Sequence, residues 1–154
     1  MIRLAVVAVA TLAAACTQPE TPSEQPSPAA NSSNGALPAP TPSDVATRIN
    51  AAQDGQTVQV GVNQRFAVEL VGVPTAGYVW QPAQMPSFLT RAGDASGPTI
   101  AAQNQPGHAG GNHWEVLMFA ATGPGSGELV LEQRRPWETT EPPAHTFRVT
   151  IVAH

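Results

Sequence analysis

The chain has 154 residues, enough for one domain with additional segments. It contains 16 prolines and 13 glycines, only 12% of its residues are charged, and its formal net charge is −4. Every basic residue is an arginine, and these arginines form no basic patch in the sequence, so nucleic acid is not an expected partner.

The first 15 residues have the pattern of an export signal. Arg3 is followed by an apolar run over residues 4–12, and three alanines then precede Cys16, the only cysteine of the chain. The run is too short to span a bilayer. A lone cysteine after small residues resembles a bacterial lipobox, in which the cysteine is lipidated and the chain is cut just before it. We therefore expect residues 1–15 to be a lipoprotein signal peptide and Cys16 to be the membrane anchor, which leaves the domain without a disulfide. An ordinary signal peptide is the alternative.

Residues 16–43 are expected to form a linker after the lipidated cysteine. They are rich in Pro, Ser, Thr, Asn and Gln and nearly empty of large apolar side chains, so they cannot bury enough surface to fold. Thr17 is not the aspartate that often signals retention in the inner membrane, so we expect an exported protein at the outer membrane or periplasm. The domain is expected over residues 44–154. Its first part, Asp44 to Ala52, is either a short helix capped by Ser43 or Asp44, or irregular chain.

From Gly55 onward, apolar and polar residues alternate with the period of β-strands. In residues 114–119 both sets are apolar apart from Glu115, which indicates a strand covered on both faces. Residues 81–105 show only a weak signal for one or two short strands. About seven or eight short strands separated by Gly and Pro turns predict an all-β, immunoglobulin-like antiparallel sandwich. The expected large core residues are Phe66, Trp80, Trp114, Phe119 and Phe147.

Three connections between the expected strands carry unusual loop residues. Alternate connections of an antiparallel sandwich lie at the same end, so we expect the three to cluster. Pro74 and Gly77 give the first a fixed shape, and the second is glycine-rich around His108. The third presents Trp137 beside Arg135, a pairing common in interface anchors. Their ordinary alternatives are a tight turn, a flexible hairpin, and a tryptophan folded back over the end of the sandwich.

No set of residues indicates an enzyme. The single cysteine is assigned to the lipid anchor, no glycine-rich phosphate loop precedes a helix, and the acidic residues occur singly. His108 and His113 have no third ligand at a spacing typical of a metal site. We therefore expect no catalytic residues, no metal and no cofactor.

Taken together, the three loops resemble the recognition loops of the chagasin-type inhibitors of papain-like cysteine proteases. Residues 73–78 read Val-Pro-Thr-Ala-Gly-Tyr where the family has Asn-Pro-Thr-Thr-Gly followed by Tyr or Phe. Residues 108–111 read His-Ala-Gly-Gly in place of Gly-x-Gly-Gly, and residues 135–137 are an intact Arg-Pro-Trp. The departures, at Val73, Ala76 and His108, bear on the strength of inhibition more than on the fold.

The resemblance implies a reversible, noncovalent inhibitor that fills the cleft of a papain-like cysteine protease with three loops and acts as a monomer. Two other functions stay open at this point: a surface adhesion or scaffold lipoprotein, and a carbohydrate-binding sandwich that uses Trp137 as a stacking platform. The residues that the resemblance assigns to protease binding are Pro74, Thr75, Ala76, Gly77, Tyr78, His108, Ala109, Gly110, Gly111, Arg135, Pro136 and Trp137.

Overall fold

The computed structural model describes residues 35–154. The expected signal peptide, Cys16 and most of the expected linker lie outside these residues. In the described part of the chain, no helix is long and apolar enough to cross a membrane.

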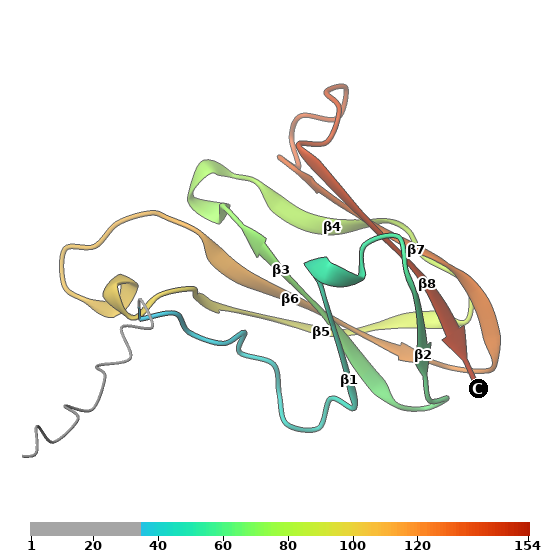
Figure 1. Ribbon diagram of the computed structural model, residues 1–154. Coiled ribbons are helices and arrows are strands. Elements are labelled where there is room, and N and C mark those ends of the chain that lie inside the picture. Colours follow the sequence, from blue (N-terminus) through green and yellow to red (C-terminus); the bar gives the residue numbers. More distant parts are fainter. Residues whose placement is uncertain (1–34) are drawn as a thin grey trace, which may run out of the picture. The chain divides into compact units, whose positions relative to one another are not determined.

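Two four-stranded sheets pack face to face, as Figure 1 shows. Neighbouring strands run antiparallel except at one edge of each sheet, where β1 runs parallel to β3 and β2 runs parallel to β8. The all-β sandwich expected from the alternation is confirmed. In spatial order, the first sheet is β1 (Thr47–Asn50), β3 (Arg65–Gly72), β6 (His113–Ala121) and β5 (Leu89–Pro98), and the second is β2 (Thr57–Val60), β8 (His145–Ala153), β7 (Gly125–Arg134) and β4 (Val79–Gln84).

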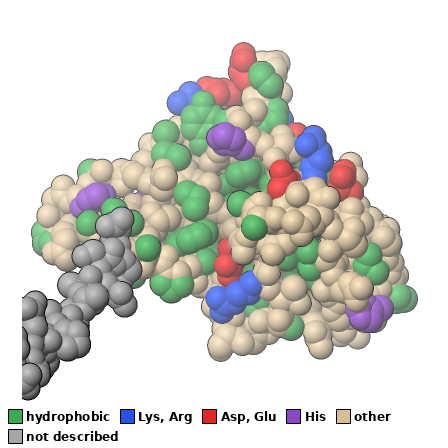
Figure 2. Space-filling model, in the orientation of Figure 1, with side chains coloured by type: hydrophobic (Ala, Val, Ile, Leu, Met, Phe, Trp, Pro, Cys, Tyr) green, Lys and Arg blue, Asp and Glu red, His purple; other side chains and the backbone are tan. Residues whose placement is uncertain are grey.

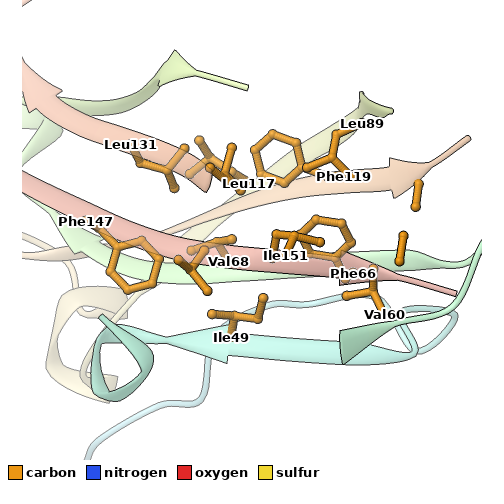
Figure 3. Close-up of a cluster of buried hydrophobic side chains, with 14 of the residues drawn as sticks. Ile49, Val60, Phe66, Val68, Leu89, Leu117, Phe119, Leu131, Phe147 and Ile151 are labelled. Atoms are coloured by element: carbon orange, nitrogen blue, oxygen red, sulfur yellow. The ribbon is translucent and has the colours of Figure 1, made fainter. Parts of the chain in front are cut away.

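The main core fills the space between the two sheets (Figure 3). Phe66 of β3 lies opposite Phe119 of β6 in the register, and their rings stack with centroids 5.5 Å apart. Because successive strand residues point to opposite faces, every second residue of the central strands enters this core. Its fully buried members, at less than 2% exposure, include Ile49, Val68, Leu129, Leu131, Val149 and Ile151.

Strand β6 is covered on both faces, as residues 114–119 predict. Leu117 and Phe119 enter the main core, whereas Val116 and Met118 belong to a second buried cluster that Ala39 helps to cover. The expectation for the tryptophans needs correction. Phe147 is buried, but Trp80 and Trp114 are only partly buried and pack against the margins of the two clusters, because each indole N–H turns to a backbone carbonyl.

Residues 44–52 do not form the expected short helix, and only residues 44–46 are irregular. Strand β1 follows them, and a 3-10 turn, η1 (Ala51–Gln53), begins directly after it. Pairing with β3 outweighs the local signals, because it brings Ile49 opposite Val68 and buries Ile49 completely. Further along the chain, the weak region of residues 81–105 contains the ten-residue edge strand β5. Its outer position and a bulge between Arg91 and Gly93 explain why it lacks apolar alternation.

A segment that composition assigns to the linker lies against the first sheet. Ala39 is only 9% exposed and belongs to the second buried cluster, together with Val45 of the expected domain. Pro40 packs beside Gly97 of β5, and Thr41 donates a hydrogen bond to the carboxylate of Glu69. The sandwich is therefore already in contact with the chain several residues before Asp44.

Candidate functional site

The three connections singled out by the sequence leave the same end of the sandwich (Figure 1). They are the β3–β4 loop (residues 73–78), the β5–β6 loop (residues 99–112) and the β7–β8 loop (residues 135–144). The hydrophobic side chains seen in Figure 2 gather on a face that continues from this end over the middle of the molecule. A cavity of about 480 Å³ on the sandwich is lined by Val71, Trp80, Trp114 and His145, among others.

The β3–β4 loop is short and held by its own backbone. Residues Pro74–Ala76 form a 3-10 turn, η2. Within it, the N–H of Ala76 donates to the carbonyl of Val73 and the N–H of Gly77 donates to that of Pro74, both at 2.9 Å. Val73 and Tyr78 close the loop with an antiparallel bridge. The side chains of Pro74, Thr75 and Ala76 are exposed at the tip of this fixed turn.

Gly77 is required at its position for two independent reasons. Its φ of +82° lies in the left-handed region that side-chain-bearing residues rarely adopt. In addition, a Cβ atom at this position would lie only 2.4 Å from Cη2 of Trp137, so the indole sits directly on the bare backbone of Gly77. The first and third loops are therefore packed together through this glycine.

Trp137 is exposed although it touches Gly77. Its exposed fraction is 68%, the highest among the large hydrophobic side chains of the described residues. The indole thus seats one edge on the first loop and leaves most of its surface to solvent. The ordinary alternative, in which Trp137 folds back to cover the end of the sandwich, therefore does not apply.

Arg135 ties the third loop to the first. Its Nε donates to the carbonyl of Ala76 at 3.0 Å, and its guanidinium carbon lies 4.6 Å from the centroid of the Tyr78 ring. Its Nη1 also donates to the carboxylate of Glu138 at 2.9 Å, and this hydrogen bond raises the pKa of Arg135 further above its ordinary value. The guanidinium therefore stays charged and supports the first loop through the Ala76 carbonyl and the Tyr78 ring.

The β5–β6 loop is organised by Gln103, a residue that the sequence patterns did not indicate. Its Oε1 accepts hydrogen bonds from the N–H of Thr99 at 2.7 Å and of Ile100 at 3.1 Å, while its Nε2 donates to the carbonyl of Asn112 at 2.7 Å. One side chain thereby joins the two ends of the loop. A Cβ at Gly111, whose φ is +97°, would lie 3.1 Å from Gln103 Nε2, so glycine also allows this close approach.

The tip of the β5–β6 loop reaches the first loop. The position of a Cβ on Gly110 lies 3.8 Å from Oγ1 of Thr75, which is van der Waals distance. His108 and Ala109 are exposed beside it. Nowhere in residues 35–154 do three or more His, Cys, Asp or Glu side chains converge as metal ligands.

Glu115 braces the base of the first loop from inside the sandwich. Its Oε2 accepts a hydrogen bond from the N–H of Trp80 at 2.8 Å, so a residue of the first sheet holds the start of β4 in the second. Its Oε1 is buried without a hydrogen-bond partner against Gly72, where no Cβ would fit. This burial raises the pKa of Glu115 above its ordinary value. The signal in the sequence was an acidic residue inside the otherwise apolar strand of residues 114–119.

The comparisons with known proteins agree with this architecture. The family model of the chagasin family peptidase inhibitor I42 matches residues 59–151, more than half of the chain. Among solved structures, the chain is similar to the cysteine protease inhibitor EhICP2 of Entamoeba histolytica, with a TM-score of 0.59 and 18% identity over 70% of this chain and 95% of that one. It is also similar to amebosin, with a TM-score of 0.55 and 24% identity over 70% of this chain and 97% of that one. At these identities the likeness concerns the fold. The comparison with curated protein sequences gives no match.

Proposed function

The chain belongs to the chagasin family of peptidase inhibitors, and from this premise we propose that it blocks papain-like cysteine proteases by inserting its three clustered loops into their active-site cleft. As a member of this family, the chain is an inhibitor and not an enzyme. The similar protein of Entamoeba histolytica is a cysteine protease inhibitor, which supports the class of the target.

One observation supports the three-loop mechanism more than any other: the loops contact one another before any partner is present. Trp137 sits on Gly77, Arg135 bonds the carbonyl of Ala76, and Gly110 lies next to Thr75. A surface that is already ordered loses little conformational entropy on binding, so more of the contact energy appears as affinity. The three loops therefore act as one preformed edge.

The geometry of the first loop also explains how it can enter a protease without being cut. The carbonyls of Val73 and Pro74 accept hydrogen bonds inside the 3-10 turn, and that of Ala76 accepts one from Arg135. Cleavage needs an extended peptide whose carbonyl is free to enter attack geometry. A 3-10 turn rises about 2.0 Å per residue against about 3.3 Å for a strand. The loop occupies the cleft in a shape that the catalytic cysteine cannot attack, so inhibition is noncovalent.

A titration of papain with the purified protein tests this function. We expect competitive inhibition with one inhibitor monomer per protease, full recovery of activity on dilution, and an unchanged inhibitor mass after incubation. A serine protease such as trypsin is the control and should be unaffected. Absence of papain inhibition at micromolar concentration, or inhibition accompanied by cleavage within residues 73–78, would contradict the proposal. An adhesion or carbohydrate-binding module would leave papain fully active.

Substituting Gly77 by alanine should weaken papain inhibition by about tenfold or more, which corresponds to about 1.4 kcal/mol. The new Cβ strains a backbone at φ +82° and displaces Trp137 from its seat. Gly55→Ala is the matched control, because Gly55 also has a positive φ of +71° but nothing lies within 4 Å of its Cβ position. Both variants should lose similar stability in thermal melts, but Gly55→Ala should inhibit normally. Equal inhibition by the two variants would show that the contact between Trp137 and Gly77 does not contribute to inhibition.

We further propose that the protein is exported and anchored through Cys16 to a bacterial membrane, at the outer membrane or periplasm. The support is the alanine triplet before the single cysteine, preceded by a short apolar run. Since Gly35 lies against Ala101 in the β5–β6 loop, the described chain begins at the end of the sandwich that carries the three loops. An anchored inhibitor would thus meet its target close to the point where the linker joins the domain.

A Cys16→Ser substitution in the full chain should move the protein from the membrane fraction to the soluble fraction, or leave it uncleaved. The reason is that serine offers no thiol for the acyl chains, which supply the membrane affinity. Fractionation followed by mass measurement distinguishes these outcomes, and a linker variant such as Ser32→Ala should stay in the membrane. A Cys16→Ser protein that is cleaved normally and still membrane-bound would refute the anchor.

A further inference from the structure

The described chain opens with an extended segment, residues 35–42, which we call the N-terminal strap. Its prolines, at positions 38, 40 and 42, alternate with Leu37, Ala39 and Thr41. Pro38 and Pro40 are exposed, whereas Ala39 is buried and Leu37 and Thr41 are half-buried. Proline fixes its own φ and keeps the preceding residue extended, so this sequence favours the extended path before any contact forms.

The start of the strap pairs with the start of the β5–β6 loop. The N–H of Leu37 donates to the carbonyl of Thr99 at 2.8 Å, and the N–H of Ala101 donates to that of Gly35 at 2.6 Å. Ala36 and Ile100 form the antiparallel bridge between these two bonds. In Figure 1 the strap accordingly begins beside the turn that follows β5. Two backbone hydrogen bonds thus fix the part of the loop that directly follows β5.

The strap also holds the far end of the same loop. Nε1 of Trp114 donates to the carbonyl of Leu37 at 2.8 Å, and Trp114 is the second residue of β6. Leu37 therefore bonds to the first residue of the 14-residue stretch 99–112 through its N–H, and to Trp114, just beyond its last residue, through its carbonyl. Three glycines of this stretch, at positions 107, 110 and 111, have positive φ. Such a loop has many alternative conformations, so an external support has a large effect on its order.

We propose that the N-terminal strap is a positioning segment of the inhibitor, which holds the β5–β6 loop in the shape that contacts the protease. Its effect on inhibition rests on the proposed function, whereas its effect on the order of the loop does not. The strap needs no contact with the protease. It acts through Leu37, whose two backbone hydrogen bonds hold the ends of the loop. Gln103 then bonds across the loop to Asn112, and Gly110 stays beside Thr75 of the first loop.

The comparison of Leu37→Pro with Leu37→Ala tests the proposal in the full chain. Proline removes the N–H that bonds to Thr99, and alanine keeps it while removing the same side chain. Trp114→Phe is a second variant that keeps an aromatic ring but removes the donor to Leu37.

Two measurements are made on each variant. Hydrogen exchange of the bonded amides of Gln103, Gln105 and His108 reports the order of the loop, and papain titration reports the effect of that order on inhibition.

We expect exchange at these amides to accelerate about tenfold or more in Leu37→Pro and Trp114→Phe but not in Leu37→Ala, with inhibition weakened in the same two variants by a similar factor. Thermal melts identify a variant that fails to fold, and the other of the two then decides the question. Unchanged exchange in Leu37→Pro and Trp114→Phe would overturn the proposal, as would faster exchange with undiminished inhibition. If the unaltered protein does not inhibit papain, the proposed function fails, while the exchange measurement still decides whether the strap orders the loop.

Discussion

Replacing Phe119 by alanine should lower the free energy of unfolding by about 3–5 kcal/mol. Phe119 is completely buried, and its ring stacks on that of Phe66 at 5.5 Å in the middle of the main core. Alanine would remove the ring from both the stack and the apolar contacts between the sheets, and the surrounding strands could close the resulting cavity only in part. The loss is large against the total stability of a domain, about 5–15 kcal/mol.

Denaturant unfolding measures this effect, and two further variants calibrate it. Phe119→Leu keeps most of the volume and should cost less than about 1.5 kcal/mol. Glu128→Ala, on an exposed position of β7, should stay within about 0.5 kcal/mol of the unaltered protein. A loss of less than about 1 kcal/mol for Phe119→Ala would mean that the two phenylalanines are not the centre of the core. The chain has only one cysteine, Cys16, so no disulfide within the domain can offset the loss of stability in Phe119→Ala.

The sandwich could be predicted from the sequence because its central strands obey a strict alternation. Residues 66–70 and 147–151 send every second side chain into the core, which is the direct consequence of strand geometry. Strand β5 could not be predicted in the same way. As an edge strand with a bulge between Arg91 and Gly93, it needs few apolar residues, and it is specified by its register against β6 instead. Strand β1 likewise depends on pairing with β3, which lies 15 or more residues away and leaves no local pattern.

The candidate site was predictable to a similar degree. The three loops could be expected at one end because antiparallel connections alternate between the ends of a sandwich. The residues that organise them were not predicted. Gln103 bonds to residues at both ends of its loop, and Leu37, in the segment expected to be linker, bonds to Thr99. Such long-range polar contacts depend on the final backbone, so composition and periodicity cannot indicate them. The same holds for Arg135, whose hydrogen bond to Ala76 makes it a support of the first loop as well as a residue of the third.

Substituting Trp137 by alanine should weaken papain inhibition by about 30- to 1000-fold, since a buried aromatic anchor is worth about 2–4 kcal/mol at an interface. The free protein leaves 68% of this side chain exposed, so most of its apolar surface is available to a partner. Thr75→Ala removes only one hydroxyl at the tip of the first loop and should have a smaller effect. Because Trp137 is mostly exposed in the free protein, the melting temperature of Trp137→Ala should stay nearly unchanged.

A double-substitution cycle separates the roles of Trp137 and its seat. If Gly77→Ala weakens inhibition mainly by displacing the indole, then in a Trp137→Ala background it should weaken inhibition little further. The effects of the two substitutions on inhibition will then be strongly non-additive. Additive effects would mean that the first loop binds independently of the third. A parallel loss of stability and inhibition in Trp137→Ala itself would assign the indole to the packing of the domain, and the preformed edge would then lack its main anchor.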